Sequence, residues 1–146
     1  MRSGRKRCFV VRPRLISQFM LAATACYAGA LLLLTHWPRV SVPAMPGLGL
    51  PLDKIAHVGL YAGLAMLVAV TNHLGGLARR WFIPTLFVGI AAFAAADEAT
   101  QILSGRTCDF KDWLFDLIGA AGGLVLVSSI TRFIGPVANM DLDRQP

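Results

Sequence analysis

The chain has 146 residues, of which 55% are hydrophobic and 15% are charged, and its net charge is +6. Soluble domains carry about 25% charged residues, so this composition favours a membrane protein. The cations form no basic stripe interleaved with aromatic residues, which argues against nucleic acid as a partner. The three cysteines form no CxxC pair, so no disulfide framework is indicated. Six cations precede the first apolar run, as expected beside a membrane segment: Arg2, Arg5, Lys6, Arg7, Arg12 and Arg14.

Four stretches of the chain are long and apolar enough to cross a bilayer, which takes about 20 mostly apolar helical residues. They are residues 15–37, 54–74, 81–103 and 112–133. The third stretch reaches this length only if Asp97, Glu98 and Gln101 are counted as part of it. We therefore predict an all-α membrane protein whose four transmembrane helices form a compact bundle.

The bundle is predicted to be a single domain over residues 15–134. A basic cytoplasmic segment (1–14) precedes it, and a cytoplasmic tail (135–146) follows it. Residues 38–52 contain four prolines and two glycines, so we expect an irregular external connection there. A cleaved signal peptide is the alternative for the first run, but its apolar stretch is long and continues through LLLLTHW.

The distribution of cations orients the helices, because cytoplasmic loops carry an excess of Lys and Arg. The basic N-terminal segment, the short turn GGLARR and the C-terminal tail are cationic, whereas the other two connections hold few cations beside acids. This predicts a multi-pass protein of the inner (cytoplasmic) membrane with both termini in the cytoplasm. Trp37, Trp81 and Trp113 lie at predicted span edges, where indole rings favour the interface.

Small residues recur at helical spacing in three of the predicted spans. Such pairs let helix backbones approach closely, so we expect them to pack the bundle. A dimerisation face, and hence a homo-oligomer, is the alternative. The residues are Gly59 and Gly63, Gly119 and Gly123, and Ala22, Cys26 and Ala30.

Polar side chains line one face of the second span and one face of the fourth. Asp53, His57 and Tyr61 are spaced four apart, and Asp112 and Asp116 have the same spacing. With the predicted orientation, both sets lie near the outer membrane surface. Acids within a membrane are costly, usually face the bundle interior, and are either paired or functional.

The third span brings further polar groups to the same surface. Asp97 and Gln101 share a helical face, and Glu98 lies about 100° away from Asp97. We expect these residues and their neighbours to form one polar pocket, in which acids share protons or recruit a cation. Its candidate residues are Asp53, Lys54, His57, Tyr61, Asp97, Glu98, Gln101, Arg106, Asp112 and Asp116.

Several of these residues also have a purely structural interpretation. Asp53 and Asp112 could cap the second and fourth helices, with Asp109 as a solvated loop acid. Lys54 could extend its ammonium group to the membrane interface. His57 could be a buried histidine whose hydrogen bonds are satisfied.

Patterns for other chemistries are missing from the sequence. HExxH, GxSxG and P-loop patterns do not occur. His57 and His73 are 16 residues apart, or about 24 Å along a helix, so they cannot share a metal on one straight helix. We therefore expect no metal site and no cofactor. The sequence identifies no catalytic residue.

Three segments together resemble the VanZ-like family of small bacterial membrane proteins: DKIAHVGLYAGL, DEATQ and GRTCDFKDWLFDLIGAAGG. The resemblance covers about residues 53–123. It departs from the family pattern at Ser104, where many members have proline, and at Asp116, which is often asparagine. The namesake of the family is associated with resistance to teicoplanin, a glycopeptide antibiotic that binds cell-wall precursors. The resemblance thus implies a protein that acts in the cell envelope.

Three functions remain open from the sequence. The favoured one is a non-enzymatic envelope factor whose outward-facing pocket binds a lipid head group, a glycopeptide or a lipid-linked cell-wall precursor. The second is a membrane-embedded enzyme that acts on a lipid-linked substrate. The third is a proton or cation path, which is disfavoured because the inner ends of the spans offer mainly Asn72 and His73.

Overall fold

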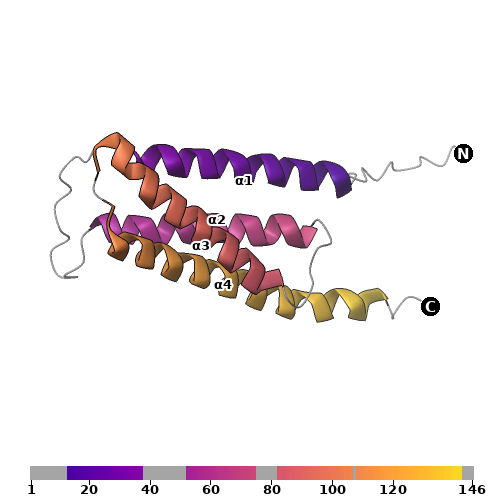
Figure 1. Cartoon of the computed structure of the whole chain (residues 1–146). Coiled ribbons are helices and arrows are strands. Elements are labelled where there is room, and N and C mark those ends of the chain that lie inside the picture. Colours follow the sequence, from indigo (N-terminus) through magenta and orange to yellow (C-terminus); the bar gives the residue numbers. More distant parts are fainter. Residues whose placement is uncertain (1–12, 38–51, 75–81, 107, 143–146) are drawn as a thin grey trace, which may run out of the picture.

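The structure is a computed structural model of the whole chain, and it describes residues 13–37, 52–74, 82–106 and 108–142. The basic segment 1–14 and the connection 38–52 lie outside these residues, except where they border a helix. The described residues contain five helical elements and no strand (Figure 1). These are α1 (Pro13–Thr35), α2 (Leu52–Leu74), α3 (Phe82–Thr100), the short 3₁₀ helix η1 (Gln101–Ser104) and α4 (Phe110–Leu142).

Four stretches of the described helices are long and apolar enough to span a membrane: Leu15–Thr35, Leu52–Leu74, Ile83–Ser104 and Phe110–Phe133. This confirms the predicted all-α membrane fold, and α4 continues beyond its span into the predicted tail. Large apolar side chains such as Phe19 (72% exposed) and Leu33 (72% exposed) cover the outside of the bundle. An apolar exterior is what a bilayer requires. The chain is therefore a multi-pass membrane protein.

The closest contact in the bundle joins α2 and α4, which run in the same direction. A Cβ atom added at Gly119 would overlap the carbonyl oxygen of Val58, and one at Gly123 would overlap that of Ala62. Only glycine lets the two backbones approach this far, as small residues do between membrane helices. The predicted packing role therefore fits Gly119 and Gly123.

Gly63 and Gly59 differ from each other in their surroundings. A Cβ atom at Gly63 would meet the ring of Tyr27, whose hydroxyl donates to the carbonyl of Leu60 (3.0 Å), so Gly63 makes room for α1. At Gly59, by contrast, no described atom lies within 4 Å of such a Cβ. The expectation that Gly59 packs against another helix is not met among the described residues.

The small residues of α1 do not face the bundle. Ala22, Cys26 and Ala30 are all exposed, and α1 packs instead through Tyr27 and Leu31. The prediction that these three residues pack within the bundle is therefore wrong, because they lie on the outer face of the helix. Helical spacing alone cannot tell which side of a uniformly apolar helix turns inward.

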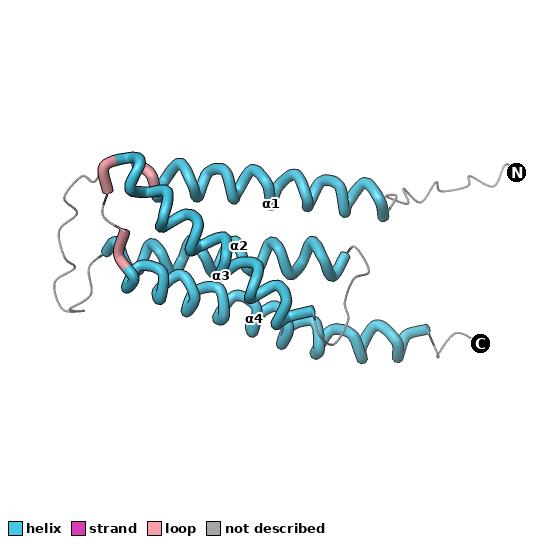
Figure 2. The backbone as a smooth tube through the Cα atoms, in the orientation of Figure 1, coloured by secondary structure: helices cyan, strands magenta, loops and turns pink. Residues whose placement is uncertain are grey.

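A sharp turn follows α3. Gly105 has φ +75°, a left-handed conformation that favours glycine, and its N–H donates to the carbonyl of Ile102 (3.1 Å). The chain then doubles back into α4, where the indole N–H of Trp113 donates to the carbonyl of Ala91 in α3 (3.2 Å). The described loop segments all lie at this end of the bundle (Figure 2).

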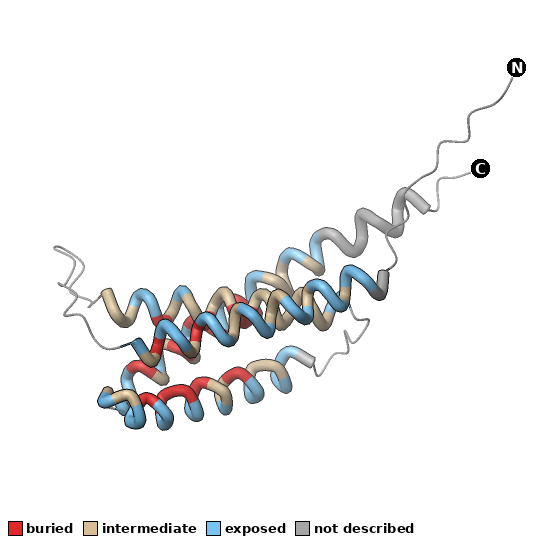
Figure 3. Tube along the Cα trace, turned by 90° about the horizontal axis from the view of Figure 1, so that it is seen from above, coloured by how far each residue is buried: buried red, intermediate tan, exposed pale blue. Residues whose placement is uncertain are grey.

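We call this end of the bundle the polar end: α1 and α3 finish there, and α2 and α4 begin there (Figure 1). Buried residues gather in the half of the bundle nearest to it (Figure 3). The other half has an apolar interior, with Leu64, Ala65 and Leu124 among its buried residues.

Candidate functional site

Polar side chains from all four long helices meet at the polar end. Every polar residue that is buried within the described part of the chain lies here, and several are almost wholly buried, such as Gln101 (0% exposed) and Asp112 (0% exposed). We define the polar cluster as Thr35, His36, Asp53, Lys54, His57, Tyr61, Asp97, Glu98, Gln101, Arg106, Asp109, Asp112 and Asp116. The structure thus brings together all ten pocket residues that the sequence predicted.

Asp97 joins three helices through its two carboxylate oxygens. Oδ1 accepts a hydrogen bond from the hydroxyl of Thr35 in α1 (2.9 Å), and Oδ2 accepts one from the hydroxyl of Tyr61 in α2 (2.9 Å). The imidazole Nδ1 of His36 lies 3.5 Å from Oδ1. Asp97 is therefore held at a fixed place between α1, α2 and α3.

His57 and Asp116 form a buried pair between α2 and α4. Nδ1 of His57 lies 2.8 Å from Oδ1 of Asp116, and both side chains are at most 4% exposed. The pair follows from the packing, because Gly119 lets α4 approach α2 beside it. A carboxylate at Nδ1 favours the tautomer that carries its proton there, which turns the acceptor Nε2 away from Asp116.

Lys54 does not reach outward to the membrane interface as the structural interpretation suggested. Its ammonium group donates to Oδ1 of Asp112 (2.5 Å), lies 3.8 Å from Oδ2 of Asp109, and lies over the ring of Phe115. The side chain is only 15% exposed. Lys54 is therefore part of the cluster.

Arg106 ties the turn after η1 to α1 and α2. Its Nη1 donates to the carbonyl of Thr35 (2.5 Å), one of the last carbonyls of α1 that have no partner within the helix. Its Nη2 lies 3.7 Å from Oδ1 of Asp53, which is 35% exposed. The side chain of Arg106 is 7% exposed, so a cation is buried at the centre of this end.

The capping acid of α4 is Asp109, and the capping interpretation of Asp112 is wrong. The side chain of Asp109 accepts from the backbone N–H of Lys111 (2.9 Å), and its carbonyl accepts from the N–H of Asp112 (2.9 Å). The backbone N–H of Asp109 itself donates to Glu98 Oε1 (2.5 Å). Asp112 is thereby left inside the helix with its side chain directed at α2.

Some buried polar atoms of the cluster have no hydrogen-bond partner within the described residues. They include both donors and acceptors, and burying such an atom without a partner costs about 1–3 kcal/mol. Gln101 is the clearest case, because neither its amide nitrogen nor its amide oxygen has a partner. The atoms are Glu98 Oε2, Gln101 Nε2 and Oε1, Arg106 Nε and Nη2, and Asp116 Oδ2.

An apolar groove of about 360 Å³ begins directly below the cluster. It is lined by residues of α1, α2 and α3, which include Ala28, Leu64, Leu86 and Phe93. The ring of Phe93 packs against that of Tyr61, with 6.4 Å between the ring centroids. Phe93 of the groove thus contacts Tyr61, whose hydroxyl donates to Asp97 of the cluster.

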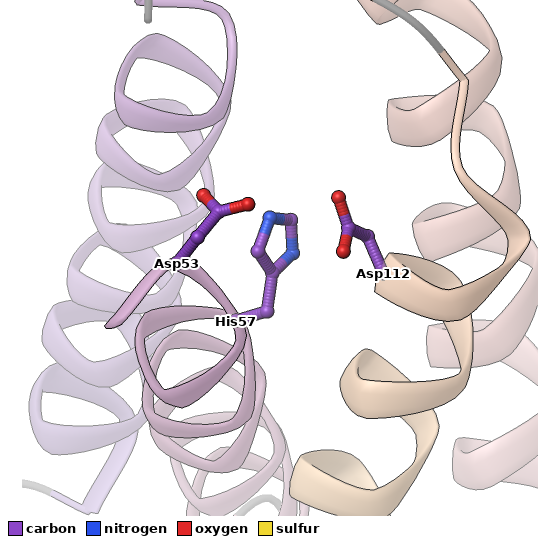
Figure 4. A group of neighbouring side chains, drawn as sticks. All are labelled: Asp53, His57 and Asp112. Carbon is purple, nitrogen blue, oxygen red and sulfur yellow. The ribbon is translucent and has the colours of Figure 1, made fainter. Parts of the chain in front are cut away.

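Three residues of the cluster bring side-chain atoms that could bind a cation close together. One ligand atom each from Asp53, His57 and Asp112 lie within 4.8 Å of one another. Figure 4 shows the imidazole between the two carboxylates, with the three side chains facing one space. Asp116 lies behind the imidazole at Nδ1.

The sequence analysis did not assign α1 to the site. Two residues at the end of α1 belong to it nevertheless: Thr35 contacts Asp97, and Nε2 of His36 lies 3.1 Å from the hydroxyl of Thr100. Their position at the predicted outer end of the first span was a signal, since that end lies level with Asp53.

Comparison with known protein families decides the relationship that the three segments suggested. The sequence model of the VanZ/LLP1 family matches residues 13–132, from the start of α1 to the end of the fourth span. The chain belongs to the VanZ/LLP1 family. No curated protein and no solved structure matches the chain. The match extends beyond residues 53–123 and includes α1, which supplies Thr35 and His36 to the cluster.

Proposed function

We propose that this VanZ/LLP1 protein binds an envelope amphiphile in the bacterial cytoplasmic membrane without changing it chemically. The polar head of the amphiphile would bind in the polar cluster, and its hydrocarbon chain would lie in the apolar groove. The amphiphile belongs to the class of lipids and lipid-linked cell-wall precursors, or of glycopeptides that carry an apolar chain.

The observation that carries this proposal is the fully buried amide of Gln101, which has no partner within the described residues. Folding alone would favour an apolar side chain there, because an unpaired buried amide is unfavourable. The amide lies among other unpartnered atoms of both kinds, acceptors on Glu98 and donors on Arg106. Such a mixture suits a head group that has both anionic or carbonyl oxygens and hydroxyl or ammonium donors.

The apolar groove supports an amphiphile over a fully soluble ligand. Along α3 it reaches from Thr85 to Phe93, which is about 12 Å of helix within the span, and Asp97 lies one helical turn above Phe93. A molecule with its head at Asp97 would thus have its chain directed into the hydrocarbon layer. Small-molecule sites commonly combine an apolar lining with a few placed polar groups.

Two alternatives are weaker. A conduction path would need polar groups through the other half of the bundle, where the buried residues of the described part are apolar. An enzyme is favoured only by the His57–Asp116 pair, which resembles the base and its orienting group in nucleophilic catalysis. Turnover of a lipid-linked precursor by the purified protein would establish the enzyme and overturn the non-enzymatic proposal.

The proposal is tested in a strain that lacks this protein, by lipid profiling and by sensitivity to glycopeptides such as teicoplanin. We expect a change in one class of envelope lipid or in drug sensitivity, which the wild-type chain reverses. Gln101→Leu should fail to reverse it. Gln18→Leu, the same substitution at an exposed position of α1, should behave as wild type. Full rescue by Gln101→Leu would contradict the proposal.

A further inference from the structure

We propose that Asp53, His57 and Asp112 bind a divalent transition-metal cation of the zinc type at the polar end. This inference goes beyond the proposed function and does not depend on it. The sequence predicts no metal site, because neither the spacing of its histidines nor a known motif indicates one, and a site assembled across two helices leaves no such pattern.

The three side chains lie close enough together to share one cation. The two carboxylates and the imidazole come from the first turns of α2 and α4, and their ligand atoms lie within 4.8 Å of one another. Bonds of about 2.0–2.2 Å place two ligand atoms of one zinc ion at most roughly 4.4 Å apart. The observed arrangement therefore closes around a cation through side-chain shifts of less than about 1 Å.

Further support comes from the far side of the imidazole. Metal-ligating histidines almost always donate their other ring N–H to a carboxylate, a carbonyl or a water. His57 has this arrangement, because Nδ1 is paired to the buried Asp116 and the other ring nitrogen faces the carboxylate of Asp53 (Figure 4). The side chain is 4% exposed, and the structure gives it no hydrogen bond besides the one to Asp116 within the described residues. Asp116 is thus a positioning residue and not a ligand.

The carboxylate of Asp112 can bind a cation while it contacts Lys54. Buried ions are tolerated when they are paired or coordinate a metal. Lys54 already contacts Asp112, but a carboxylate has two oxygens and about four lone-pair directions, so it can accept from a lysine and bind a cation together.

The ligand set selects the type of cation. Imidazole suits zinc, copper, iron and nickel, whereas magnesium and calcium prefer oxygen ligands throughout. Three protein ligands leave at least one coordination position for water or for an anionic oxygen of another molecule. Asp53 is the least buried of the three, so the cation would be reached from the polar end.

The test uses the full-length protein in detergent with Cys8, Cys26 and Cys108 all replaced by serine, so that thiols cannot bind zinc. After treatment with a chelator, zinc is titrated in by calorimetry. We expect one zinc per chain, and X-ray absorption should show nitrogen and oxygen ligands. Asp53→Asn and His57→Gln should each weaken binding at least about 100-fold, and Asp116→Asn about 10- to 100-fold.

His73→Gln is the matched control, because it makes the same change on the same helix at the opposite end of α2, and it should leave zinc affinity unchanged. Melting temperatures of all variants show whether a loss of binding reflects a loss of fold. If a ligand variant does not fold, the zinc stoichiometry and the X-ray absorption spectrum of the Cys-free parent still decide whether the site exists. Absence of stoichiometric zinc in that parent, or wild-type affinity in a folded His57→Gln variant, would overturn the inference. Neither result bears on Gln101→Leu, so failure of the metal site and failure of the proposed function are distinguishable.

Discussion

The two halves of the bundle are held together in different ways. Away from the polar end, the helices meet through small residues and apolar side chains, as where Gly123 lies against the backbone of Ala62. At the polar end the same helices meet through carboxylates, a histidine, a lysine and an arginine. The apolar half shows that these helices can pack without buried charge. Because buried ion pairs are weak contributors to stability, the polar end requires an explanation other than packing.

The largest expected contrast is between the polar end, which we expect to be accessible to water, and the lipid-covered part of the bundle. Cys108 is exposed at the polar end, and Cys26 is exposed on the membrane-facing side of α1. If both termini lie in the cytoplasm, as the distribution of cations predicts, a membrane-impermeant maleimide added to intact cells (spheroplasts, if the host has an outer membrane) should label a chain in which Cys108 is the only cysteine. A chain with Cys26 alone should stay unlabelled, because lipid covers that position. Labelling of Cys108 only after the cells are opened would reverse the predicted orientation.

The contact between α2 and α4 should be the most sensitive to added volume. Gly119→Ala places a methyl group against the carbonyl of Val58, which cannot rotate away, and should cost about 3 kcal/mol in unfolding free energy. Gly122→Ala is the control on the same helix, since no described atom lies near its Cβ position, and it should gain up to about 1 kcal/mol. Reversible unfolding in detergent measures both. Equal effects would mean that the close approach of the helices is not what stabilises the bundle.

Tyr61 and Tyr27 allow a hydrogen bond at the polar end to be compared with one in the rest of the bundle. Tyr61 donates to the buried carboxylate of Asp97, whereas Tyr27 donates to a neutral backbone carbonyl. Tyr61→Phe should cost about 2 kcal/mol, because it removes a donor from a charged acceptor. Tyr27→Phe should cost about 0.6 kcal/mol, as neutral bonds between membrane helices do. The same unfolding measurement applies, and a larger loss at Tyr27 would contradict the contrast.

The fold was predictable from the sequence to the extent that it depends on length and polarity. The four spans followed from apolar runs, and the residues that meet at the polar end followed from helical spacing near the predicted outer ends. The inward face of α1 did not, because apolar residues surround that helix and Ala22, Cys26 and Ala30 turned out to be exposed. Side-chain partners also could not be predicted. Asp109, and not Asp112, caps α4, because the helix begins at Phe110, before Asp112.

The central claim is that the polar end binds a ligand rather than holding the bundle together, and Gln101 tests it most directly. The wild-type chain, Gln101→Leu and Gln18→Leu are extracted in a mild detergent and examined by native mass spectrometry for bound amphiphile, beside their melting temperatures. We predict that Gln101→Leu retains or raises the melting temperature, because it removes an unpaired buried amide, and that it lowers occupancy at least about tenfold, or about 1.4 kcal/mol. Gln18→Leu should match wild type in both. Wild-type occupancy in Gln101→Leu, or a loss of stability without any bound amphiphile in the parent chain, would contradict the account.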